Sequence, residues 1–259
     1  QKNYDAKEIL LKLIAVKDSE IHRLALSQLT QKYPSSASSV LIGFYNQQTY
    51  KDKSFLLDLM KDVKIPAVEQ LLIKIIQSSP NRSFEVIEAA KASEKETLKN
   101  LYKSYLNGQK DPILAPYAHT FTGGRIRNGK VVFNNRAGQC ISCHKVGNEG
   151  CVAGPDLSKI SASNNKLYLL ESLVNPNAKI APGFGTVLVP LKDGSVKAGV
   201  LHKEGEKTIE LKDMEGKTIS INKSNIKEQT KPISGMPPMA ALLSPKELRD
   251  LIAYLGSLK

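Results

Sequence analysis

The sequence predicts a mainly α-helical protein that carries a small antiparallel β-sheet in its second half. Three observations support this fold class: helix-like periodicity over about the first 100 residues, strand-like alternation at about 184–230, and a capped helix pattern after Ser244. The chain has 259 residues, of which 41% are hydrophobic and 24% charged, enough for one large domain or two small ones. No run of about 18 apolar residues occurs, so the sequence predicts no membrane span.

Residues 1–115 are expected to form a helical domain. Residues 5–16 place apolar side chains on one face of a helix, and Asp18 is a suitable N-cap for a second helix that Pro34 ends. Further helices are expected over 54–61, 66–78, 83–92 and about 94–106. Such a succession predicts paired helices stacked as a solenoid or an irregular helical bundle, and both interpretations stay open because no two repeats align residue by residue.

The helical pattern stops between Gly108 and Gly124, where two X-Pro steps predict an extended linker. We place the domain boundary there, which gives domains of residues 1–115 and 120–259. In the second domain, residues at about 184–230 alternate as in strands, and turn signals separate the strands. The turn signals are Lys192-Asp193-Gly194, Glu204-Gly205-Glu206 and Met214-Glu215-Gly216. Their spacing predicts an inserted antiparallel meander of four or five strands.

The last helix has a complete N-terminal signature. Ser244 and Glu247 are spaced as a capping box, and Pro245 would occupy the first helical position. The apolar face of this helix is expected to consist of Leu248, Leu251, Ile252 and Leu255. A mainly helical second domain is therefore expected around the β-insert.

The chain is basic, with 37 Lys and Arg against 25 Asp and Glu. The excess is larger after Asp111, where 20 basic residues face 12 acidic ones. A basic surface favours acidic partners, but the chain has no Trp and does not interleave aromatic with basic residues, so we expect no nucleic-acid partner. Five lysines of the predicted sheet form either a solvated face or a docking surface for an acidic partner: Lys192, Lys197, Lys203, Lys207 and Lys212.

The string Cys140-Ile141-Ser142-Cys143-His144 is the strongest chemical signal in the chain. A Cys-x-x-Cys pair is typical of zinc sites, redox dithiols and covalent haem attachment. Zinc needs further ligands, which the spacing of Cys151, His119 and His202 does not supply, and a redox dithiol needs a βαβ setting that is not predicted here. A His directly after the second Cys is typical of haem attachment, in which both thiols add to the porphyrin vinyl groups and the imidazole binds the iron.

The neighbours of this motif are similar to those of class I c-type cytochromes. In that family a Gly and an aromatic residue on the first helix meet an aromatic residue on the last helix, and Gly129, Phe133 and Tyr254 match these positions. The resemblance also implies that the carbonyl group of Pro155 accepts a hydrogen bond from the proximal His144, which would fix the imidazole tautomer.

The same resemblance implies a Met as the sixth iron ligand. Met236 matches the family position and precedes two prolines that would stiffen its loop, whereas Met239 is a rival three residues on. The expected metal ligands are therefore His144 and Met236, with one covalently attached haem c. Cys151 is left over, and three interpretations are open for it: a buried free thiol, an intermolecular disulfide or a small apolar residue.

More narrowly, residues 124–259 resemble the haem-binding domain at the C-terminus of large secreted proteins of planctomycetes and Bacteroidetes. The shared features are Gly154-Pro155-Asp156-Leu157, Leu170 to Pro176, the β-insert, Met236-Pro237 and the C-terminal helix. Such proteins often carry a PQQ-dependent dehydrogenase-like propeller and helical repeats ahead of this domain, so the resemblance implies HEAT-like repeats for the N-terminal helices. The resemblance implies a cytochrome c fold with a β-insert for residues 120–259.

An iron held by His and Met has no open position, which is typical of an electron carrier rather than an enzyme. We therefore expect single-electron transfer between a dehydrogenase and a downstream acceptor. The resemblance implies that the dehydrogenase is PQQ-dependent. Two alternatives stay open: a haem enzyme or ligand sensor in which Met236 leaves the iron, and a helical scaffold with an accessory haem domain.

Covalent haem attachment implies an exported bacterial protein, periplasmic or extracellular. The chain begins at Gln1 without an apolar signal segment, as expected of a processed form or a fragment.

Overall fold

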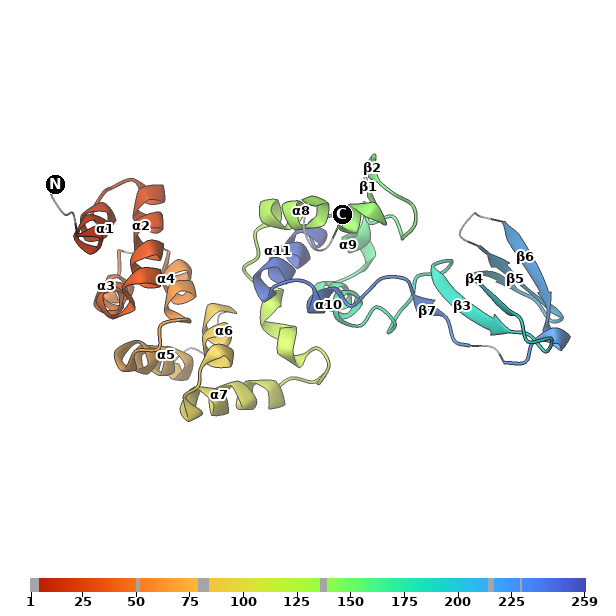
Figure 1. The fold of residues 1–259 in the computed structure, drawn as a ribbon, viewed down its shortest axis with the longest axis horizontal. Coiled ribbons are helices and arrows are strands. Elements are labelled where there is room, and N and C mark those ends of the chain that lie inside the picture. The colour runs from red at the N-terminus through yellow and green to blue at the C-terminus, as the bar shows by residue number, and fades with distance from the viewer. Residues whose placement is uncertain (1–4, 50–51, 79–83, 136–138, 214–216, 229) are drawn as a thin grey trace. The chain divides into compact units, whose positions relative to one another are not determined.

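The computed structural model describes residues 5–49, 52–78, 84–135, 139–213, 217–228 and 230–259 (Figure 1). The chain forms two compact units, Gln1–Lys110 and Asp111–Lys259. It is mainly α-helical and carries a small antiparallel sheet in the second unit, so the predicted fold class is confirmed. Among the described residues, no helix has both the length and the apolar character needed to cross a membrane.

The described part of the first unit consists of helices. They are α1 (Ala6–Ile14), α2 (Ser19–Lys32), α3 (Pro34–Asn46), α4 (Lys53–Met60), α5 (Pro66–Ser78), α6 (Phe84–Ala92) and α7 (Glu96–Asn107). All except α3 lie within two residues of predicted helices. Asp18 caps α2 as expected, because its Oδ1 accepts hydrogen bonds from the backbone N–H groups of Glu20 and Ile21, 2.9 and 3.0 Å away.

α3 has no counterpart among the predicted helices, which end at Pro34 and resume at about residue 54. Its first half is rich in serine and Gly43 lies in its second half, and both residue types are weak helix formers. Pro34 occupies the first turn of α3 instead of ending the helical region. Ala37 and Leu41 are fully buried, so tertiary packing stabilises a helix that the local sequence does not favour.

One apolar core holds the first unit together. Most of these helices contact a neighbour in sequence, and some also contact the next but one, as α3 contacts α5 and α4 contacts α6. Leu26, Leu56 and Met60 have no exposed surface, as expected for core side chains. Stacking of this kind is compatible with a solenoid, and the HEAT-like character of the unit stays a prediction.

The second unit contains the Cys-rich segment and the C-terminal helix. Its helices, with η denoting a 3-10 helix, are η1 (Ala115–Phe121), α8 (Ile126–Asn135), η2 (Cys140–Ser142), α9 (Ile160–Ser163), α10 (Lys166–Val174), η3 (Lys223–Asn225), η4 (Met239–Ala241) and α11 (Pro245–Leu255). The prediction of an extended linker over 108–124 is wrong for η1. Pro116 fits the first turn of a helix, and Leu114 and Thr120 are buried in the unit. Packing therefore favours a helical conformation for this segment.

α8 and α11 cross in close contact, as the resemblance implies (Figure 1). A Cβ atom on Gly129 would lie 2.0 Å from the carbonyl oxygen of Asp250 and 2.6 Å from Cβ of Tyr254. The rings of Phe133 and Tyr254 meet edge to face with centroids 5.6 Å apart. Asp250 is 4% exposed and its Oδ1 accepts a hydrogen bond from the backbone N–H of Arg125, 2.8 Å away, at the start of α8. Backbone contact, ring packing and a cap from the other helix thus fix this crossing.

The β-insert is a five-stranded antiparallel sheet with strand order β6-β5-β4-β3-β7. The strands are β3 (Gly185–Pro190), β4 (Val196–Glu204), β5 (Thr208–Lys212), β6 (Thr218–Asn222) and β7 (Ile233–Ser234). β3 to β6 form the predicted meander, and β7 returns to pair with β3 on its other side. Val187 and Val189 are fully buried while Leu188 is exposed, as the alternation predicts. The turn predicted at 214–216 lies outside the described residues.

Candidate haem-binding site

The Cys-x-x-Cys-His segment forms a tight turn that leads from α8 into a short hairpin of β1 (Lys145–Val146) and β2 (Glu149–Gly150). The carbonyl oxygen of Cys140 accepts hydrogen bonds from the backbone N–H groups of Cys143 and His144, 3.1 and 2.8 Å away. Gln139, directly before the turn, has a φ of 36°, a left-handed conformation that is rare for residues other than glycine. The turn therefore brings the backbones of Cys140, Cys143 and His144 close together.

The three cysteines differ in their surroundings. Cys140 is half-buried at the edge of the helical core of the second unit, and burial raises the pKa of its thiol to about 11. Cys143 is exposed. Cys151 is exposed as well, which contradicts its interpretation as a buried thiol. The motif therefore presents one half-buried and one exposed thiol, three residues apart.

Pro155 holds the imidazole of His144. Nδ1 of His144 lies 2.9 Å from the carbonyl oxygen of Pro155, so with its proton on Nδ1 the ring donates this hydrogen bond. The lone pair of Nε2 is then available to a metal ion. The backbone N–H of Gly154 donates to the carbonyl oxygen of Cys143, 2.6 Å away, and closes the loop between them. The contact between His144 and Pro155 is the one that the resemblance implies.

Two glycines pack against His144 and form a slot for it. A Cβ atom on Gly154 would lie 2.7 Å from Cε1 and 2.8 Å from Nδ1 of the imidazole. Gly150 has a φ of 100°, and a Cβ atom there would lie 2.2 Å from the carbonyl oxygen of His144. Neither glycine is among the predicted site residues. The run of glycines after the Cys-x-x-Cys-His motif is the sequence signal that indicates them.

Met236 and Met239 lie in different environments. Met239 begins η4 and is 4% exposed within the helical core of the second unit. Met236 is half-buried at the edge of the same core, as is Cys140. Met236 is therefore the more accessible of the two thioethers, because core side chains already enclose Met239.

These residues fit a covalently bound porphyrin. Partly buried apolar side chains pack against the helical core of the second unit, among them Ile141, Val146, Leu157, Ile160, Tyr168 and Met236. Within the described part of the chain, no three His, Cys, Asp or Glu side chains gather into a set that could hold a metal ion. One oriented imidazole, two thiols and an apolar border suit a porphyrin, which supplies four nitrogen ligands of its own.

The other histidines and the lysines of the sheet lie outside this arrangement. Nδ1 of His22 lies 2.7 Å from the carbonyl oxygen of Ile14, and its ring packs edge-on against Phe44, so His22 is a satisfied helical side chain. His119 is buried in η1, and His202 is exposed on β4. The five lysines named above are all exposed, as both interpretations of that surface require.

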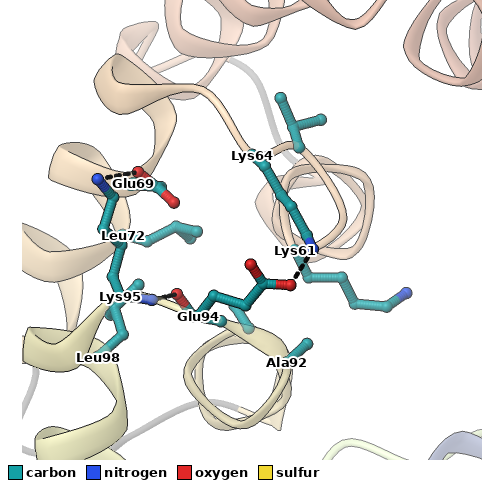
Figure 2. A pocket seen from close by; sticks show the side chains of 11 residues that line it. Lys61, Lys64, Glu69, Leu72, Ala92, Glu94, Lys95 and Leu98 are labelled. Atoms are coloured by element: carbon teal, nitrogen blue, oxygen red, sulfur yellow. Dashed lines mark hydrogen bonds and ion pairs between the residues drawn. The ribbon is translucent and has the colours of Figure 1, made fainter.

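A separate pocket of about 270 Å³ lies in the first unit (Figure 2). Its buried apolar lining comprises Val63, Leu72, Ala89 and Leu98. Ion pairs join opposite charges on its rim: Nζ of Lys64 lies 2.5 Å from Oε1 of Glu94, and Nζ of Lys95 lies 3.4 Å from Oε2 of Glu69. The hydrogen bond with Glu94 raises the pKa of Lys64 and lowers that of Glu94. None of the predicted site residues lines this pocket.

Comparison with known proteins agrees with the geometry of the second unit. The family model described as cytochrome c matches residues 126–190, from the first residue of α8 to the last residue of β3. The match covers about a quarter of the chain, includes Cys140, Cys143, His144 and Pro155, and ends before Met236. No curated protein matches the chain. The match at 126–190 supports a c-type cytochrome with covalently bound haem and an electron-carrying role.

Proposed function

We propose that residues 120–259 form a monohaem c-type cytochrome that carries single electrons between a dehydrogenase and a downstream acceptor protein. The observation that carries this proposal is the 2.9 Å contact between Nδ1 of His144 and the carbonyl oxygen of Pro155. This hydrogen bond gives the imidazole the tautomer and the orientation of a metal ligand, one residue after a pair of thiols.

The residues of the site have separate roles in the proposal. Cys140 and Cys143 would hold the haem through thioether bonds, and Nε2 of His144 would bind its iron. Met236 would be the second iron ligand from the chain, since Met239 is enclosed by the core. When bound, the haem supplies the one-electron chemistry. A thioether ligand favours ferrous iron, and two ligands from the chain leave no open iron position, which makes the domain a carrier rather than an enzyme.

The partners and location follow from the same chemistry. An electron carrier needs a protein that delivers electrons and one that removes them, and the sequence resemblance favours a PQQ-dependent dehydrogenase as the donor. Haem attachment through thioethers favours a periplasmic or extracellular protein. The net charge of +12 favours partners with acidic surfaces.

Mass spectrometry and optical spectroscopy test the proposal together. Chain produced in the periplasm of a host that attaches haem to Cys-x-x-Cys-His motifs should carry the mass of one haem after denaturation. The double variant Cys140→Ser, Cys143→Ser should have the mass of the polypeptide alone. An unmodified mass for the natural sequence would contradict the proposal.

A second measurement, optical spectroscopy of the oxidised protein, tests whether Met236 is an iron ligand. The oxidised protein should show the far-red charge-transfer band of ferric iron bound by a Met sulfur. Met236→Ala should abolish this band and open the iron to carbon monoxide, while the matched variant Met239→Ala should keep the band and lower only stability. Rapid binding of carbon monoxide by the natural sequence would favour a haem enzyme or sensor instead.

A further inference from the structure

We infer, on the basis of the proposed function, that Asn177 and Ser234 are positioning residues for Met236, through which the β-sheet restrains the sixth iron ligand. Two hydrogen bonds run in series from a loop of the helical core, through the last residue of the sheet, to the backbone of Met236. Neither Asn177 nor Ser234 belongs to the sequence-predicted site.

Ser234 joins the Met236 segment to the sheet. It is the last residue of β7 and lies opposite Gly185 of β3. Its Oγ accepts a hydrogen bond from the backbone N–H of Met236, 3.1 Å away. A Cβ atom on Gly185 would lie 2.7 Å from Cβ of Pro232, so only a glycine lets the chain enter β7 this close to β3. Strand pairing therefore fixes the position of Ser234, and Ser234 in turn holds Met236.

Asn177 joins Ser234 to the helical core. Its Oδ1 accepts a hydrogen bond from the backbone N–H of Ser234, 2.8 Å away. Asn177 follows α10, whose buried side chains Leu169, Leu170 and Leu173 belong to the helical core. α10 also contacts η4, the short helix that contains Met239. Strand pairing thus joins Ser234 to the sheet, and its hydrogen bond to Asn177 joins it to the loop that follows α10.

The residues around Met236 explain why these bonds matter. Gly235 separates Ser234 from Met236, and a Cβ atom on Gly235 would meet no atom within 4 Å, so side-chain packing does not restrain this position. Glycine also has the greatest backbone freedom of any residue. On the other side, Pro237 and Pro238 lead into η4, in which Met239 is buried. The bond to Ser234 therefore supplies the restraint on the N-terminal side of Met236 that packing does not.

Losing either hydrogen bond should make Met236 easier to displace from iron. One hydrogen bond of ordinary net strength changes an equilibrium by roughly three- to tenfold. The experiment uses the haem-loaded chain of 259 residues. It measures the imidazole concentration that displaces half of the Met ligand, the far-red band of the oxidised form and the reduction potential. Ser234→Ala and Asn177→Ala should lower that imidazole concentration by about three- to tenfold and lower the potential.

Matched variants separate positioning from general damage to the sheet. Ser220→Ala and Asn222→Ala remove the same side chains from exposed positions on β6, at the opposite edge of the sheet, and should behave as the natural sequence does. Ser234→Thr and Asn177→Asp keep an acceptor oxygen and should restore the imidazole midpoint. Unchanged midpoints in Ser234→Ala and Asn177→Ala would overturn the inference.

A reference variant distinguishes this failure from failure of the proposed function. If Met236→Ala abolishes the far-red band while the two alanine variants leave it and the midpoint unchanged, only the positioning role is wrong. If Met236→Ala leaves the band unchanged, the sixth-ligand assignment is wrong and the positioning role falls with it. If the alanine variants do not fold, hydrogen exchange of the natural sequence decides, because unprotected amides at Ser234 and Met236 contradict both bonds.

Discussion

Gly129 of α8 lies against the carbonyl group of Asp250 in α11, so closely that a Cβ atom on Gly129 would be 2.0 Å from the carbonyl oxygen. Four residues further along α8, Phe133 packs edge-on against Tyr254 of α11. The helix that precedes the Cys-x-x-Cys-His motif is thereby joined to the last helix, α11, by backbone contact and by ring packing.

This contact predicts a large effect of a single methyl group. Gly129→Ala should destabilise the second unit by about 3 kcal/mol, because both helix backbones would have to move apart. Urea unfolding followed by haem absorbance measures the change. Gly43→Ala in α3 is the control, since its Cβ would meet no atom within 4 Å, and it should be neutral or stabilising. Equal stability of the two variants would contradict close contact at the crossing.

Asp250 should contribute to the same crossing by capping α8. Its carboxylate accepts hydrogen bonds from the backbone N–H of Arg125 and from Nδ2 of Asn128, 2.8 and 3.3 Å away. Asp250→Ala leaves these donors without this acceptor and should cost about 1–3 kcal/mol of unfolding free energy. Asp250→Asn keeps one acceptor oxygen and should cost less. An alanine variant as stable as the natural protein would show that the cap is unimportant.

Gly154 should matter for iron ligation and not for haem attachment. Gly154→Ala places a Cβ atom within 2.8 Å of the His144 ring, so the imidazole must shift. The mass of the haem-loaded chain should stay unchanged, while the optical spectrum should show a weakened proximal ligand. Val152→Ala is the control, because Val152 is 79% exposed. Identical spectra for Gly154→Ala and the natural protein would contradict the slot around His144.

Cys140 should react slowly in chain prepared without haem. Burial raises the pKa of its thiol to about 11, so at about pH 8 only about 0.1% is thiolate, against roughly a quarter for a thiol of ordinary pKa. Alkylation followed by peptide mapping should therefore modify Cys140 at least about tenfold more slowly than the exposed Cys151.

The same raised pKa has a consequence for stability. Above the ordinary thiol pKa of about 8.5 the unfolded chain loses its Cys140 proton first, so the contribution of this group to folding falls as the pH rises toward about 11. Urea unfolding of haem-free chain at several pH values measures this loss, and Cys140→Ala should reduce it. This prediction and the alkylation prediction both depend on the partial burial of Cys140, which equal alkylation rates for Cys140 and Cys151 would contradict.

The sequence predicts the parts of this protein that local chemistry decides. The capping box of Ser244 and Glu247 is present, with the Ser244 N–H donating to Oε2 of Glu247 at 2.9 Å. The Cys-x-x-Cys-His motif and the alternation of β3 are likewise short patterns whose meaning does not depend on distant residues. The match at 126–190 agrees with the first of these.

Packing decides the parts that the sequence does not predict. α3 and η1 form where weak helix formers and prolines argue against helices, because α3 packs against α2, α4 and α5 and η1 packs against α10 and α11. The bond between Asn177 and Ser234 joins residues 57 positions apart. Contacts of this kind depend on which distant residues the fold brings together, and the pattern of a single sequence does not encode them.

The pairing of Gly185 with Ser234 means that the insert leaves the helical core and rejoins it at almost the same point. Opposed strand residues lie only about 5 Å apart, a gap that a short turn would bridge as well. The helical core therefore keeps the same two attachment points, Gly185 and Ser234, whatever the sheet contains. The strands between them can change in length or in their outward side chains over evolutionary time. Outward side chains of the sheet can therefore change without moving the point at which the chain leaves and re-enters the helical part of the second unit.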